Sequence, residues 1–522
     1  MSIGRLLLIL LFVGVSLSLG EVIRVPEDAP TIQAALDAIA DGDTVLVAVG
    51  EYAEALHAPP LSFVLRGRVL ADTGDYPRPV VDPSRLPGSD SLACLILPAN
   101  SHPIVEDMKF RNGPAMSGAW GGIRSASPDP VLRRCCLDSL YLAFHQDVDS
   151  PDYVITLESC LFRHDSVMCV RAGLSQVRAT DCLFSGYGFW LVTAGGGSRF
   201  VRCRFRDNDQ GHLLVAYGRD IEISGCIFGP YGPYAFVAVD ICAMRGSRIC
   251  DNLFTECQPG MGVLSVSTDT ADGVLVQGNV FINNQVVMGQ GFAGMGFGYW
   301  WDGDPSQSGI IQDNIFTACS TNTGVKGLSV GAPARVNHNR FADLSPPSRP
   351  AVMVFSNGVV LRNNVFERNG LGINTENAGP VDARWNWWGD STGPYHSSLN
   401  PEGRGDEVQG NVEFIPWYSD TSFLYTTPRG TPSPEAFDLQ AYPNPFNAGL
   451  SIRFRVPDPG IFRVELFDVL GRRATELHWG PVAGVMEIEY DARTLSSGVY
   501  FIRATDTIFN RSVAMCKVVH LR

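Results

Sequence analysis

The sequence predicts an all-β protein: a right-handed parallel β-helix of about twelve coils followed by a small immunoglobulin-like β-sandwich. Three observations predict this fold class. A short motif recurs at intervals of 21 to 35 residues, Gly and Pro are abundant while charged residues make up only 18%, and residues 437–522 keep alternating strands but lose the repeat. At 522 residues the chain is too long for one ordinary globular core.

The charge balance limits the partners that we expect. Asp and Glu number 54 against 40 Lys and Arg, which gives a formal net charge of −14. Such a surface repels phosphate backbones, so we expect no nucleic-acid partner.

The first twenty residues have the pattern of a signal peptide. Arg5 gives the positive start, residues 6–15 form an apolar run too short to span a bilayer, and Ser18 and Gly20 supply small residues before the cleavage point. We expect cleavage after Gly20. No later segment is long and apolar enough to suggest a transmembrane segment in the mature chain.

The next segment predicts a cap for the open end of the rod. Thr31 is a suitable N-cap for a short amphipathic helix with Ile32, Leu36 and Ile39 on one face. An Asp-Gly-Asp turn then leads into the first buried strand, residues 44–49.

The repeat is an apolar residue, two spacers, Cys or Asn, one spacer and then Phe, as in Ile223-x-x-Cys226-x-Phe228. The third position marks each coil, and its occupants are Met108, Cys135, Cys160, Cys182, Cys203, Cys226, Asn252, Asn279, Asn314, Asn339, Asn364 and Asn386. Ile223 has an odd number and Cys226 an even one, so in one straight strand they would face opposite sides. For both to face inward, the chain must bend between them. Short strands joined by regular bends predict a three-stranded coil, and twelve coils predict a rod about 55–60 Å long.

Stacked coils place equivalent residues above one another. We therefore expect an internal aromatic stack formed by Phe162, Phe184, Phe205 and Phe228, and a ladder of amides from Asn252 onward. Five of the thirteen cysteines occupy the slot that asparagine takes in later coils, namely Cys135, Cys160, Cys182, Cys203 and Cys226. Since their spacing follows the repeat, we expect buried thiols in place of a disulfide framework.

Both ends of the repeat region resemble a known superfamily. Residues 25–52 contain Pro30-Thr31-Ile32-Gln33 and Gly42-Asp43-Thr44-Val45, and the far end contains Trp385-Asn386-Trp387-Trp388-Gly389-Asp390. These motifs resemble the N-terminal cap and the closing coil of the pectin-lyase-like superfamily of right-handed parallel β-helix proteins. The resemblance frames a β-helix over residues 21–417. It implies little about activity, since the superfamily includes lyases, hydrolases, esterases and adhesins.

Residues 418–436 are rich in Ser, Thr and Pro and predict a linker. Residues 437–522 contain Tyr442-Pro443-Asn444-Pro445-Phe446-Asn447, a Leu466–Arg473 segment and Ser497-Gly498-Val499-Tyr500. These motifs resemble the C-terminal sorting domain of type IX secretion cargo. The resemblance implies that residues 437–522 engage outer-membrane secretion machinery, and that the protein is secreted or held at the outer-membrane surface of a diderm bacterium.

The longest interval of the repeat, between the eighth and ninth markers, gives the candidate site. Its extra residues include Tyr299, Trp300 and Trp301, which we expect to bind a ligand, and Asp302 and Asp304, which are candidate catalytic carboxylates. Aromatic rings pack on sugar faces, while carboxylates accept hydroxyl hydrogens or act as acid and base. The two aspartates could also ligate calcium, and we expect no other cofactor or metal. Packing of the loop against the rod is the alternative.

A second group of polar residues is His145, Asp147 and Asp149. It could be a metal or acid–base cluster, but a polar loop between coils is the simpler interpretation.

Two functions stay open. The first is a secreted or cell-surface rod that binds polysaccharide or serves as a structural or adhesive element. The second is a polysaccharide lyase or glycoside hydrolase acting on acidic or plant-type glycans. A carboxylate pair with a basic residue on one sheet face would favour the enzyme, and aromatic rings without such a pair would favour binding. We favour the non-enzymatic function.

Overall fold

The computed structural model describes residues 20–68, 77–86, 93–111, 121–165, 167–208, 210–232, 237–243, 245–268, 273–286, 291–299, 309–375, 378–422, 437–456, 460–482, 485–493, 495–506 and 511–521. The predicted signal peptide therefore lies almost wholly outside the described residues, as does most of the predicted linker.

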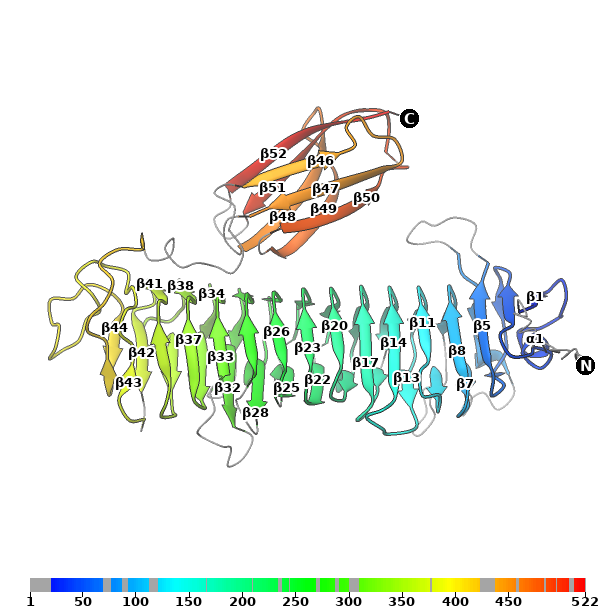
Figure 1. The fold of residues 1–522 in the computed structure, drawn as a ribbon, viewed down its shortest axis with the longest axis horizontal. Coiled ribbons are helices and arrows are strands. Elements are labelled where there is room, and N and C mark those ends of the chain that lie inside the picture. The colour runs from blue at the N-terminus through cyan, green and yellow to red at the C-terminus, as the bar shows by residue number, and fades with distance from the viewer. Residues whose placement is uncertain are drawn as a thin grey trace, which may run out of the picture.

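The N-terminal part is a parallel β-helix, as predicted, with three parallel sheets along its length (Figure 1). Each coil contributes one strand to each sheet in turn, and we number the sheets in that order. Among the described residues, sheet 1 has 16 strands, sheet 2 has 13 and sheet 3 has 14.

The strands of sheet 1 are β1 (Val22–Val25), β2 (Thr44–Val47), β5 (Ser62–Gly67), β8 (His102–Glu106), β11 (Val131–Arg133), β14 (Val154–Glu158), β17 (Gln176–Thr180), β20 (Arg199–Val201), β23 (Glu222–Ser224), β26 (Arg248–Cys250), β29 (Leu275–Gln277), β33 (Gly309–Gln312), β37 (Ala334–Asn337), β40 (Val360–Arg362), β43 (Val381–Asp382) and β45 (Val412–Glu413).

The strands of sheet 2 are β3 (Glu51–Tyr52), β6 (Val80–Val81), β9 (Lys109–Arg111), β12 (Cys136–Asp138), β15 (Leu161–Asp165), β18 (Leu183–Gly186), β21 (Arg204–Arg206), β24 (Ile227–Phe228), β27 (Leu253–Thr255), β30 (Val280–Ile282), β34 (Ile315–Thr317), β38 (Arg340–Ala342) and β41 (Val365–Glu367).

The strands of sheet 3 are β4 (Leu56–His57), β7 (Leu95–Leu97), β10 (Ile123–Ser125), β13 (Leu142–Gln146), β16 (Met168–Arg171), β19 (Trp190–Ala194), β22 (His212–Gly218), β25 (Val237–Ala243), β28 (Gly262–Thr268), β32 (Phe292–Tyr299), β36 (Leu328–Gly331), β39 (Val352–Val354), β42 (Leu371–Thr375) and β44 (Glu407–Gln409). A small additional pair joins β31 (Gln285–Val286) to β35 (Ser320–Thr321), and a 3-10 turn covers Pro83–Arg85.

The bend between sheets 1 and 2 is a single residue in the left-handed region. It immediately precedes each marker, with φ between 51° and 67°. The residues at this bend are Asp107, Arg134, Ser159, Asp181, Arg202, Gly225, Asp251, Gly278, Asp313, His338, Asn363 and Trp385. Since one left-handed residue turns the chain without a loop, it produces the change of inward-facing parity that the sequence shows.

The predicted asparagine ladder is confirmed. The backbone N–H of Asn252 donates to Oδ1 of Asn279 at 3.0 Å, and the N–H of Asn279 donates in turn to Oδ1 of Asn314 at 2.9 Å. The Nδ2 of Asn279 donates to the carbonyl of Ile249 at 2.8 Å. Each amide therefore satisfies backbone groups that the bend would leave unpaired inside the rod.

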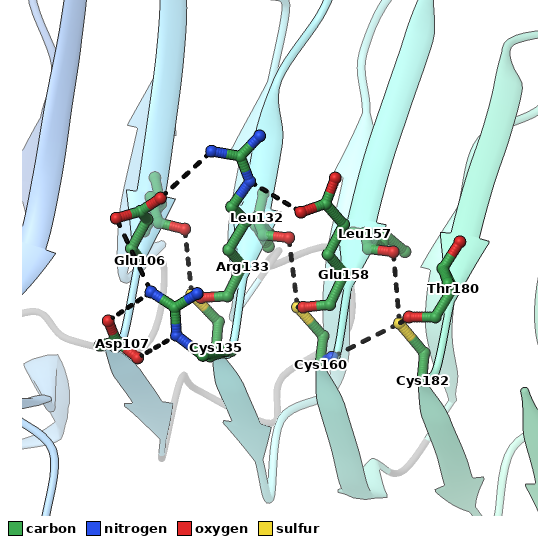
Figure 2. Close-up of polar contacts among 12 residues, drawn as sticks. Glu106, Asp107, Leu132, Arg133, Cys135, Leu157, Glu158, Cys160, Thr180 and Cys182 are labelled. Carbon is green, nitrogen blue, oxygen red and sulfur yellow. Dashed lines mark hydrogen bonds and ion pairs between the residues drawn. The ribbon is translucent and has the colours of Figure 1, made fainter. Parts of the chain in front are cut away.

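Cysteine fills the same slot in the earlier coils, and all thirteen cysteines are free thiols. The Sγ of Cys160 donates to the carbonyl of Leu132 at 3.4 Å, and the N–H of Cys160 donates to Sγ of Cys182 at 3.4 Å. Figure 2 shows this thiol ladder beside ion pairs on the outer surface, such as Arg133 with Glu158 at 2.8 Å. The predicted buried thiols are confirmed.

The aromatic stack is also confirmed and is longer than predicted. Ring centroids from Phe162 to Trp388 follow one another at 4.6 to 5.1 Å, close to the spacing of parallel strands. The rings between these two ends belong to Phe184, Phe205, Phe228, Phe254, Phe281, Phe316, Phe341 and Phe366.

A short helix covers the N-terminal end of the rod. It is α1 (Ile32–Leu36), and the Thr31 side chain caps it by accepting a hydrogen bond from the N–H of Ala34 at 3.1 Å. Ile32, Leu36 and Ile39 are buried, as the sequence predicts.

The C-terminal domain consists of two antiparallel sheets around its own apolar core. One sheet contains β46 (Asp438–Tyr442), β47 (Gly449–Arg455) and β50 (Val485–Asp491). The other contains β48 (Gly460–Asp468), β49 (Arg473–Val482), β51 (Gly498–Asp506) and β52 (Arg511–His520).

Candidate functional site

The structure places only one of the sequence-predicted site residues. Tyr299 is the last residue of β32, paired with Thr268 of β28. Trp300, Trp301, Asp302 and Asp304 lie outside the described residues, so their roles and the possible calcium site stay predictions. Among the residues that the structure does describe, we find no group of three or more His, Cys, Asp or Glu side chains suited to hold a metal ion.

The outer face of sheet 3 carries a row of side chains across consecutive strands that is polar except at Val215, which is buried. Strand register aligns, in order, Arg124, His145, Arg171, Thr193, Val215, Asp240 and Ser265. The residue before each of these points inward, and the inward residues include Phe144, Val170, Val192, Leu214, Val239 and Leu264, all fully buried. Because alternate residues of a strand face opposite sides, this row lies on the outer face of the sheet.

His145 lies between two arginines at one end of the row. Its Nε2 is 3.3 Å from Oδ1 of Asp147, and the Nε of Arg124 lies 2.7 Å from the other carboxylate oxygen. Burial lowers the pKa of His145 to about 4, and the charges of Arg171 and Arg124 act in the same direction against Asp147. The imidazole is therefore uncharged at neutral pH.

The polar loop expected at His145 is not what forms there. His145 lies within β13, paired with Arg124 and Arg171, because the coil keeps its register at this point. Asp149 does face a loop, where its carboxylate accepts a hydrogen bond from the N–H of Leu174. Sequence reasoning grouped His145 with Asp147, which the structure brings together, and with Asp149, which instead contacts Leu174. It missed both arginines, since they belong to neighbouring coils.

A second polar group lies farther along the same face. Burial lowers the pKa of His212, and the nearby Asp240 opposes this shift. Burial raises the pKa of Asp240, against the effects of His212 and of a hydrogen bond with Ser265. Within the described part of the chain, the Nδ1 of His212 is buried without a hydrogen-bond partner.

Exposed aromatic rings flank this second group. Tyr187 is 54% exposed, Phe189 59% and Trp190 37%, although large apolar side chains are usually buried. Trp190 is paired with His212 across the strands β19 and β22, and its ring meets that of Phe189 edge to face at 5.1 Å. We call Tyr187, Phe189, Trp190 and Tyr217 the aromatic platform. Tyr217, 43% exposed, stands at the far end of β22.

The backbone beneath the platform is closely packed. The N–H of His212 donates to the carbonyl of Phe189 at 2.9 Å, and the N–H of Tyr187 donates to the carbonyl of Asp165 at 3.0 Å. A Cβ on Gly188 would lie 1.7 Å from the carbonyl oxygen of Val167, so glycine is required there for the coils to stack. The rings are thus presented from a rigid surface.

The carboxylates that flank the platform are far apart. Asp147 follows β13 and Asp240 lies on β25, four strands away, which corresponds to about 19 Å at the usual strand spacing. Glycosidase carboxylates act about 5 to 9.5 Å apart. Asp147 and Asp240 are therefore too far apart to act together as the acid–base pair of a glycosidase.

The sequence contained a signal for the platform. Tyr187-Gly188-Phe189-Trp190 places three aromatic residues at the end of one of the shortest coils, where no insertion is available to bury them. The sequence-based prediction selected the later insertion because of its length, and it therefore did not include the aromatic platform.

Comparison with known proteins identifies the C-terminal domain. Residues 440–514 match the family described as the secretion system C-terminal sorting domain. The fold and this domain together define an exported β-helix protein with a type IX sorting domain, directed to the cell surface or released from the cell. In the described part of the chain we find no helix whose length and apolar character would let it cross a membrane.

No curated protein matches the sequence. Solved structures similar to the chain include the A-module of mannuronan C-5 epimerase AlgE6 from Azotobacter vinelandii, at 13% identity and a TM-score of 0.32, covering 74% of this chain and 94% of that chain. The complex of XylC with xylose has 8% identity and a TM-score of 0.33, covering 90% and 99%. The Dettilon tailspike protein gp208 has 11% identity and a TM-score of 0.28, covering 95% and 91%. We draw no functional argument from likenesses this distant.

Proposed function

We propose that this exported protein binds a polysaccharide on the outer face of sheet 3. The observation that carries the proposal is the aromatic platform, whose four exposed rings lie within or just before strands β19 and β22 of sheet 3, near the polar residue His212. Rings pack against the apolar faces of sugars, while His212, Asp240 and Ser265 offer hydrogen bonds to hydroxyl groups. Exposed apolar clusters of this kind mark interaction sites.

The predicted insertion belongs to the same proposal. Tyr299 ends a strand of sheet 3 four strands from Trp190, and it lies about six residues farther along the strand direction, which together correspond to roughly 27 Å. The chain leaves β32 at the same edge of the sheet as Tyr217, because Tyr217 shares a row with Gly298. Trp300 and Trp301 therefore follow a strand of the same sheet, three strands from Tyr217, and we retain them as candidate ligand-binding residues. Asp302 and Asp304 are retained as candidate ligands for calcium or for sugar hydroxyls.

An enzymatic role has less support. A general base must reach the proton that it removes, but His145 is only 9% exposed and its Nε2 faces Asp147. Arg124 is also bound to that carboxylate. These contacts are those of a structural cluster that gives the face a local positive charge.

A glycan-array screen of the full chain tests the proposal. The test variants are Phe189→Ala and Trp190→Ala, and the control is Phe355→Ala, an aromatic residue that is 48% exposed at the end of β39 in the same sheet. We expect wild type and control to bind the same glycans and both test variants to lose at least tenfold in affinity, since each removes a stacking surface. Equal binding by all four proteins would place the site elsewhere, and no binding by wild type would contradict the proposal.

A further inference from the structure

An apolar stripe runs along the outer face of sheet 2. Register aligns Ile227, Leu253, Val280 and Ile315 across four consecutive strands, each followed by an inward-facing phenylalanine of the aromatic stack. Outward residues of a single-layered coil normally face solvent, yet Leu253 and Val280 are each only 1% exposed. Another part of the molecule must therefore cover this stripe.

The sorting domain is the part that covers it. Trp479 of β49 packs against the same apolar cluster as Leu253 and Val280, which also includes Ile227, Ile282 and Ile315. Figure 1 shows the domain lying along the side of the rod that carries β34, β38 and β41. A Cβ placed on Gly480 would be 3.7 Å from the Cδ1 atom of Ile227, so the contact continues along β49.

Polar groups at the edge of this contact are adapted to burial. The guanidinium of Arg463 lies over the ring of Trp479, 5.2 Å from its centroid. Burial lowers the pKa of His478 to about 4, opposed by a hydrogen bond with the backbone of Gly480 and assisted by Arg204 of the rod. The histidine is therefore uncharged at neutral pH, so that docking does not place a second cation beside Arg204.

We propose that the apolar stripe is the docking surface for the sorting domain in the exported chain, and that removal of the domain uncovers it. Covalent attachment makes this small contact effective, because tethering raises the local concentration of the domain at the stripe. The docked domain covers sheet 2 and leaves the aromatic platform of sheet 3 free. While the sorting domain is attached, it thus shields the apolar stripe of the rod.

Small-angle X-ray scattering of the full chain tests this proposal. Trp479→Ser removes the anchor from the domain, and Leu253→Arg places a charge in the middle of the stripe. We expect both variants to show a larger radius of gyration and a larger maximum dimension than wild type, because the domain then samples positions away from the rod.

Two matched controls separate docking from unfolding. Leu470→Ser changes a residue of the same domain that is 72% exposed, and Leu174→Arg changes a residue of the rod that is 52% exposed. Both should scatter as wild type does, and all variants should keep the wild-type circular dichroism. The two test substitutions lie on opposite sides of the contact, so one folded test variant is sufficient. Scattering of wild type as a freely tethered ensemble, or no change in a folded test variant, would overturn the proposal.

Discussion

Replacement of Asn279 by alanine tests the energetic role of the asparagine ladder. The substitution leaves two buried backbone groups without their partners: the N–H of Asn252, now 3.0 Å from Oδ1, and the carbonyl of Ile249, now 2.8 Å from Nδ2. An unsatisfied buried polar group costs about 1–3 kcal/mol, so two such groups predict a loss of roughly 2–6 kcal/mol in the free energy of unfolding.

The earlier coils supply a matched variant, Asn279→Cys. In the thiol ladder the N–H of Cys203 donates to Sγ of Cys226 at 3.4 Å, and this sulfur donates to the carbonyl of Phe200 at 3.4 Å. A thiol at position 279 can therefore take over both contacts of the amide, though more weakly. We expect Asn279→Cys to cost about half as much as Asn279→Ala.

Urea unfolding of the full chain, followed by circular dichroism, measures these costs. Asn337→Ala is the control, because Asn337 lies on the outer side of β37 and is partly exposed. It should change the free energy of unfolding by less than about 0.5 kcal/mol. The reasoning is refuted if Asn279→Ala costs no more than the control, or if the cysteine variant is as unstable as the alanine variant.

Three further predictions concern other parts of the fold. Lys326 is fully buried, and burial lowers its pKa to about 8, whereas the charge of Asp406 raises it. Between pH 8 and about 10.4 the unfolded chain therefore binds more protons than the folded one, so the free energy of unfolding of wild type should rise with pH by up to about 3 kcal/mol relative to Lys326→Met. Urea titrations measure this difference, and no rise would contradict the lowered pKa. Ala318 has a φ of 51°, so Ala318→Gly should raise the melting temperature through relief of strain worth about 1 kcal/mol, whereas a clear fall would show that the backbone is not strained. Thiol titration should find thirteen reactive thiols in the denatured, unreduced chain, with Cys242 and Cys250 among the first to react in the folded one; a denatured count well below thirteen would indicate disulfides.

The fold was predictable because its determinants repeat along the sequence. A single Cys or Asn slot, a Phe two residues later and a change of parity define the coil, and stacking then aligns equal residues. The sequence predicted that a bend lies before each marker, but it did not predict that the bend residue has a left-handed backbone conformation. Seven of the twelve bend residues are Asp, Asn or Gly, which favour this conformation, but Arg134, Ser159 and His338 also occupy it, so residue type gives only a partial signal.

The candidate site was less predictable, because neighbouring coils build it. Arg124, His145 and Arg171 are separated by more than twenty residues in the sequence, and only strand register brings them into one row. The same holds for Trp190 and His212. An insertion can be recognised in a sequence because it lengthens the interval between two markers. A row of side chains across neighbouring strands can be recognised only when the register of every strand is known.

Hydroxyl-radical footprinting of the full chain, with and without a bound glycan, tests the central claim most directly. The account predicts that the glycan protects Phe189 and Trp190 from oxidation while Phe355, an exposed ring in the same sheet, reacts equally in both states. Protection of Trp300 and Trp301 as well would extend the site along sheet 3. Protection at Phe355, or undiminished oxidation of Trp190 in the saturated complex, would contradict a binding site on the aromatic platform.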